Sequence, residues 1–142
     1  MYKRILVPTD ASEYSKRALK TAIELAKSFQ AEIILLNVTF TPQAYWGYTI
    51  TYGFTITEEE LEQNGRLALE ATLAGIDTEG IKITSVVEDG HPVGEILDQI
   101  TDRAIDLVVI GSHGYGPISG SVLGSVSQRV LQKATCPVLL VK

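Results

Sequence analysis

Residues 106–130 read DLVVIGSHGYGPISGSVLGSVSQRV. The stretch begins with a short apolar, β-branched run, which is typical of a buried strand when glycine follows it. Five glycines then fall within residues 111–124, and glycine lets a main chain leave a strand and turn back without a Cβ clash. A helical pattern follows the last of them. The stretch therefore predicts a strand, a glycine-rich loop and a helix in succession.

The same alternation runs outward along the chain. Short apolar runs predict four further strands, at residues 3–9, 31–38, 81–88 and 137–142. Between the strands, helical periodicity and start signals predict four helices, at residues 12–29, at residues 57–75, from Pro92 and from Ser125.

Three of these helices carry a recognisable start. Thr57 with Glu60, and Ser125 with Gln128, have the spacing of a capping box. Pro92 is a favoured residue in a first helical turn. The last helix is expected to bury one face, made of Val126, Val130, Leu131 and Ala134.

Alternating strands and helices of this length predict an α/β fold: a single Rossmann-like domain over residues 1–142, with a five-stranded parallel sheet and helices on both faces. Right-handed crossovers give the strand order 3-2-1-4-5 if the first three strands wind one way and the last two the other. Ligands of such sheets bind where the order reverses, beyond the carboxyl ends of the strands. The loops there begin at PTD (8–10) and at the glycine stretch.

Charge and composition narrow the function. The chain has 142 residues and a formal net charge of −5, a sign that repels nucleic acids and anionic lipid surfaces. Its longest apolar runs are much shorter than a membrane span. Cys136 is the only cysteine, so no internal disulfide forms, and it is expected to be a small buried hydrophobe. We expect a cytoplasmic protein that binds neither nucleic acid nor membrane.

Three familiar glycine motifs do not fit the loop. A Walker A loop needs Gly-Lys-Ser/Thr, and no lysine occurs here. The dinucleotide motif G-x-G-x-x-G fails because Ser119 stands where its third glycine is required. A G-x-S-x-G nucleophile elbow is also absent. What remains is Gly111-x2-Gly114-x9-Gly124-Ser125, whose end lies at a helix N-terminus, where free N–H groups and the helix dipole favour an anion.

That spacing, followed by VSQRVLQKATCPVLLV, resembles the ATP-binding signature and C-terminal unit of the universal stress proteins. The opening ILVPTDASEYSKRAL is similar to their first strand and helix, so the resemblance spans nearly the whole chain. It implies ATP bound across the ends of the first and fourth strands. It also implies a homodimer formed through the C-terminal strand, residues 137–142.

The resemblance also implies a set of binding residues. Asp10 would bond the ribose beside Pro8 and Thr9, and the main chain of Val38 would meet the adenine. The ribose and first phosphate would lie against Gly111, Ser112, His113 and Gly114. The remaining phosphates would lie against Gly124, Ser125, Val126 and Ser127.

Simpler interpretations of these residues stay open. Asp10 is also suited to capping the first helix, although Ser12 is equally suited. Val38 has the character of a core residue, and Ser125 that of a helix cap. His113 and His91 read as loop residues, and no second ligand suggests a metal site at His113.

Two features depart from the expected pattern. No lysine or arginine occurs between Arg103 and Arg129, where members of the family often carry a basic residue. Neutralising a triphosphate would then fall to N–H groups and a bound Mg²⁺, or the protein would prefer AMP or ADP. The second feature is an aromatic-rich segment, residues 39–57, which is either a packed loop or an aromatic lid or partner surface.

The sequence therefore predicts an adenine-nucleotide-binding stress protein that acts as a homodimeric switch or sensor, with an unidentified downstream protein partner. We find no catalytic residues and no metal ligands by pattern. A slow ATPase or phosphotransferase using Asp10 or His113, and a structural dimer that no longer binds nucleotide, are the alternatives.

Overall fold

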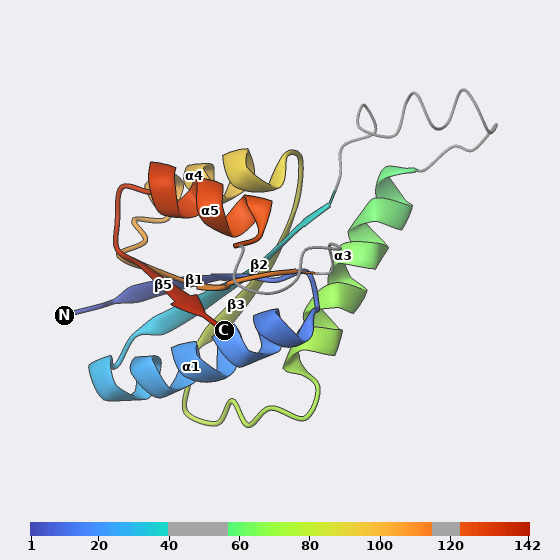
Figure 1. The fold of residues 1–142 in the computed structure, drawn as a ribbon. Helices are drawn as coiled ribbons and strands as arrows, with labels where there is room; N and C mark the ends of the chain where they lie inside the picture. The colour runs from blue at the N-terminus through green and yellow to red at the C-terminus, as the bar shows by residue number, and fades with distance from the viewer. Residues whose placement is uncertain (40–56, 115–122) are drawn as a thin grey trace.

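The computed structural model describes residues 1–39, 57–114 and 123–142 (Figure 1). Its centre is a parallel sheet of five strands in the order β3-β2-β1-β4-β5, which confirms the predicted topology. The strands are β1 (Arg4–Pro8), β2 (Glu32–Thr39), β3 (Ile83–Asp89), β4 (Leu107–Gly111) and β5 (Val138–Val141).

Helices cover both faces of the sheet. They are α1 (Glu13–Phe29), α3 (Glu58–Leu73), α4 (Pro92–Asp102) and α5 (Ser125–Lys133). α1 and α3 lie on one face, and α4 and α5 on the other (Figure 1). Each pair closes its own apolar core, one containing Leu19, Ile33 and Val109, the other Leu6, Ile96 and Val130. The result is a single three-layer domain.

The strand register opens a gap at one end of the sheet. β1 pairs with β2 along its whole length, from Arg4 to Pro8. With β4, however, it pairs only at Ile5 and Leu6, and the rest of β4 pairs with β5. The carboxyl ends of β1 and β4 therefore diverge, and the gap lies where the strand order reverses.

Three helix starts agree with the sequence and one differs. Pro92 begins α4, as predicted. Ser12 caps α1, and Thr57 with Glu60 forms the predicted capping box of α3. The box predicted for the last helix is wrong: Gly124 is its N-cap, and Ser125 is the first helical residue. Because glycine has no side chain, the N-cap residue itself offers no acceptor to the first N–H groups of α5.

One predicted core position is also wrong. Val130 is fully buried, and Val126 and Ala134 are partly buried, but Leu131 is 45% exposed. α5 has only 9 residues and turns a narrow stripe to the sheet, so Leu131, the next residue after Val130, faces outward.

Cys136 is partly buried against the α4 and α5 core. Among the described residues, no helix is both long and apolar enough to cross a membrane. Most of the aromatic segment, residues 40–56, lies outside the described residues.

Alanine substitutions at two helical glycines are expected to change stability in opposite directions. A Cβ at Gly65 in α3 would lie 2.5 Å from Val87 Cγ1 and 3.2 Å from Asn37 Oδ1, whereas no described atom lies within 4 Å of one at Gly94 in α4. Alanine favours a helix by about 1 kcal/mol over glycine, but overpacking costs about 1–3 kcal/mol. We expect urea unfolding to show that Gly94→Ala is stabilising and Gly65→Ala destabilising. An equal gain in unfolding free energy from both variants would contradict the close contact between α3 and the sheet.

Candidate functional site

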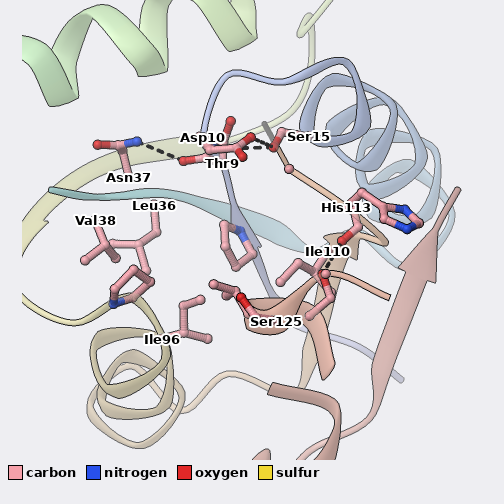
Figure 2. Close-up of a pocket in the computed structure, with 17 residues that line it drawn as sticks. Thr9, Asp10, Ser15, Leu36, Asn37, Val38, Ile96, Ile110, His113 and Ser125 are labelled. Atoms are coloured by element: carbon pink, nitrogen blue, oxygen red, sulfur yellow. Dashed lines mark hydrogen bonds between the residues drawn. The ribbon is translucent and has the colours of Figure 1, made fainter. Parts of the chain in front are cut away.

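A pocket of about 420 Å³ lies at the carboxyl ends of β1, β2 and β4 (Figure 2). It occupies the gap left by the short β1–β4 pairing, and α4 and α5 supply its far wall. Its volume is in the range of small-molecule sites.

Eleven of the twelve residues predicted from sequence line this pocket: Pro8, Thr9, Asp10, Val38, Gly111, His113, Gly114, Gly124, Ser125, Val126 and Ser127. The exception, Ser112, is buried behind it, with Oγ 2.9 Å from His113 Nδ1. The fold thus gathers residues from both ends of the chain at one place. Contact of each with a ligand stays a prediction.

Six further lining residues were not predicted from the sequence: Ser15, Leu36, Asn37, Pro92, Ile96 and Ile110. Four of these are apolar, as are Pro8, Val38 and Val126, and Figure 2 shows Leu36, Val38 and Ile96 across the pocket from Thr9 and Asp10. Ile110 was detectable as the last residue of its strand on the face that α4 and α5 cover, and Leu36 lies two residues before Val38 on the same face of β2. Ile96 and Pro92 had no such signal, because their place depends on how α4 lies across the strand ends.

The opposite side is polar and is built by the turn between β1 and α1. Ala11 has φ of +67°, a left-handed conformation that is unfavourable for a residue with a Cβ. Asp10 Oδ1 accepts hydrogen bonds from the Ser12 N–H at 2.9 Å and from the Ser15 hydroxyl at 2.8 Å. Ser12, not Asp10, caps α1. Asp10 instead holds the turn that leads into the helix.

Close approaches explain two glycines of the loop. A Cβ at Gly111 would lie 2.8 Å from Tyr14 Cβ and 2.9 Å from the Tyr14 backbone carbon, so β4 and the start of α1 can meet only at a glycine. A Cβ at Gly114 would collide with the Asp10 carboxylate. The loop after β4 is thereby brought against the β1–α1 turn.

The N-terminus of α5 is fastened to the end of β4. The Gly124 N–H donates to the Ser112 carbonyl at 2.9 Å, and the buried Ser127 hydroxyl donates to the Gly111 carbonyl at 2.6 Å. The hydroxyl proton of Ser127 is therefore engaged within the protein, which leaves its oxygen to accept. Ser125 is exposed at the first turn. A helix N-terminus held at the pocket wall is suited to an anion.

The ring of His113 packs against that of Tyr14, with ring centroids 5.1 Å apart. The Arg17 guanidinium lies over the Tyr14 ring, 4.6 Å from its centroid. In the part of the chain that the structure describes, no three histidine, cysteine, aspartate or glutamate side chains gather as a metal site would require.

Among the described residues that line the pocket there is no lysine or arginine, and Asp10 and His113 are the only ones with titratable side chains. Lysines gather instead in a groove at the opposite end of the sheet, which includes Lys3, Lys27 and Lys82. Any positive potential at the pocket comes mainly from backbone dipoles.

The structure is an open parallel α/β fold with a pocket where the strand order reverses. The sequence profile of the universal stress protein family matches residues 1–142. Universal stress protein MJ0531 of Methanocaldococcus jannaschii is 34% identical over 142 residues, 100% of this chain and 83% of its own. The chain belongs to the universal stress protein family.

Solved structures share the architecture. The structure of the protein MJ0577 of the same organism superposes with a TM-score of 0.80 at 30% identity, over 100% of this chain and 96% of that one. A universal stress protein solved in complex with cAMP gives a TM-score of 0.66 at 26% identity, over 99% of this chain and 96% of that one.

Acidic residues on and near α4 predict that the stability of the fold depends on pH. Burial raises the pKa of Glu95, on α4, and the carboxylates of Glu88 and Asp98 add to the rise. A raised pKa means that the folded state binds the proton more tightly, so stability falls as pH rises from the usual value of 4.5 through the folded pKa. We expect Glu95→Gln to raise the thermal midpoint at neutral pH and to lose this advantage in acid.

Glu24 provides the control for this experiment. It is 77% exposed and paired with Lys27 at 3.7 Å, so Glu24→Gln should not raise the midpoint at neutral pH. An unchanged midpoint for Glu95→Gln across the whole pH range would contradict the assignment.

Proposed function

We propose that this protein binds an adenine nucleotide in the pocket between β1 and β4 and works as a nucleotide-responsive switch or sensor in a stress response. The observation that carries the proposal is the pairing of an apolar wall with a glycine-capped helix N-terminus across one pocket. The apolar wall suits a nucleotide base, and the helix N-terminus suits a phosphate.

The lining residues fit the three parts of a nucleotide. The apolar side, with Leu36, Val38 and Ile96, suits the flat face of adenine. Asp10 is placed to accept hydrogen bonds from ribose hydroxyls. Ser125–Ser127, with His113 and Gly114, would present main-chain N–H groups to the phosphates, because the N–H groups of Gly124 and Ser112 already donate to carbonyls of the protein. The relative solved with cAMP supports this class of ligand.

The hydrogen bonds of Asp10 and His113 favour binding over catalysis by these residues. The Asp10 carboxylate holds its own turn, and His113 Nδ1 lies within hydrogen-bond distance of Ser112 Oγ. We therefore place both as binding residues, and expect any hydrolysis of ATP to be slow.

Charge decides which adenine nucleotide is favoured. Each added phosphate brings negative charge to a pocket without lysine or arginine. Mg²⁺ coordinated by the phosphates would supply the missing positive charge. We expect calorimetry in EDTA to show AMP binding at least about tenfold more tightly than ATP, and excess Mg²⁺ to remove most of that difference.

The variant Gly114→Ala tests whether the nucleotide binds in this pocket, because its new Cβ would collide with the Asp10 carboxylate. Its affinity for AMP should fall clearly, while Gly94→Ala should bind as the wild type does. Failure of the wild-type protein to bind any adenine nucleotide would refute the proposal. Equal, tight ATP affinity with and without Mg²⁺ would refute its account of charge.

We further propose that the protein is a homodimer through β5. This strand ends the sheet, and it carries Leu139, which is 38% exposed. An apolar edge strand favours pairing with a second copy, and a lysine on such an edge opposes it. Sedimentation should show a dimer for the wild type and a shift toward monomer for Leu139→Lys. A wild-type monomer at micromolar concentration would contradict the proposal.

A further inference from the structure

Thr9, the residue before Asp10, is held from three directions. Its N–H donates to the Leu36 carbonyl at 2.8 Å, and its own carbonyl accepts from Asn37 Nδ2 at 2.8 Å, as Figure 2 shows. Its hydroxyl lies 2.7 Å from the hydroxyl of Thr72 on α3. Thr9 and Asn37 are largely buried, and Thr72 is fully buried.

The direction of the hydroxyl contacts follows from their partners. The Thr72 hydroxyl donates to the Ala68 carbonyl at 2.7 Å, so its one proton is used there. Thr9 must then donate to Thr72, which leaves the Thr9 oxygen to accept the Ala11 N–H at 2.9 Å. A directed relay therefore runs from the Ala11 N–H through two hydroxyls to the main chain of α3.

The relay begins at the N–H of Ala11, in the turn that carries Asp10. Ala11 adopts a left-handed conformation that only its surroundings can maintain. The same turn places the Asp10 carboxylate against Gly114 and the pocket. A bond that fixes the Ala11 N–H thus also fixes the direction in which Asp10 points.

We propose that Thr72, which does not line the pocket, is a positioning residue for the nucleotide site: its hydroxyl, through Thr9, holds the β1–α1 turn in the geometry that binds ligand. Helix α3 thereby belongs to the binding machinery. The effect on affinity rests on the proposed adenine-nucleotide function, but the relay itself does not.

Two variants separate the hydroxyl from the packing: Thr72→Val is nearly isosteric, whereas Thr72→Ser keeps the hydroxyl and loses the buried methyl group. Thr72→Val keeps the shape but leaves the Thr9 hydroxyl without its acceptor, and Thr72→Ser restores the acceptor. We expect calorimetry to show AMP affinity lowered about tenfold in Thr72→Val and within about twofold of wild type in Thr72→Ser. The matched control is Thr21→Val, because Thr21 makes the same bond to a carbonyl four residues earlier, at 3.0 Å to Arg17, on the exposed side of α1.

A measurement without ligand tests the relay independently. In wild-type protein the Ala11 amide should exchange its hydrogen far more slowly than an open loop amide does. Exchange should accelerate in Thr72→Val and return to the wild-type rate in Thr72→Ser. If Thr72→Val does not fold, protection of the Ala11 amide in wild type and in Thr72→Ser still decides the question.

The outcomes distinguish the two proposals. Absence of AMP binding by the wild type, with the expected exchange pattern, would refute the nucleotide function and leave the relay supported. Wild-type AMP binding that Thr72→Val retains in full would overturn the positioning role. An Ala11 amide that exchanges as a loop amide does in wild type would overturn the relay.

Discussion

The short pairing between β1 and β4 is the constraint on which the site depends. These strands share register only at Ile5 with Leu107 and at Leu6 with Val108, whereas β1 pairs with β2 through Pro8 and β4 pairs with β5 through Gly111. The two halves of the sheet are therefore joined at the amino end and spread at the carboxyl end. The pocket occupies this gap between the strand ends. Residues of α4 and α5 line it from one side.

In the proposed nucleotide site, main-chain groups would take the place that basic side chains occupy in many phosphate sites. Gly111 and Gly114 allow the loop after β4 to lie against Tyr14 and Asp10, and Gly124 starts α5 without a side-chain acceptor. The bonds from Gly124 to Ser112 and from Ser127 to Gly111 fix the helix end relative to the strand end. These hydrogen bonds would hold the main-chain dipoles in place before a nucleotide binds, which would make their weak partial charges effective.

The sequence was sufficient for the fold and for most of the site, because both depend on local signals. Hydrophobic runs mark the strands, and the spacing of Gly111, Gly114 and Gly124 marks the loop. The sequence failed where tertiary packing decides. Ser125 has the pattern of a cap, but the chain places Gly124 at that position, and Leu131 follows a buried valine yet faces outward. Ile96 and Thr72 had no local signal, since one depends on the placement of α4 and the other on a contact between residues 63 apart.

The most direct test of the central claim is a titration of isotopically labelled protein with AMP, followed through the backbone amide resonances. Binding by main-chain N–H groups predicts the largest shifts at Gly111–Gly114 and Ser125–Ser127, with smaller shifts elsewhere. The groove with Lys3, Lys27 and Lys82 is where phosphate would go if side-chain charge governed binding. Shifts concentrated in that groove, with the amides at the β4 and α5 ends unmoved, would contradict the account.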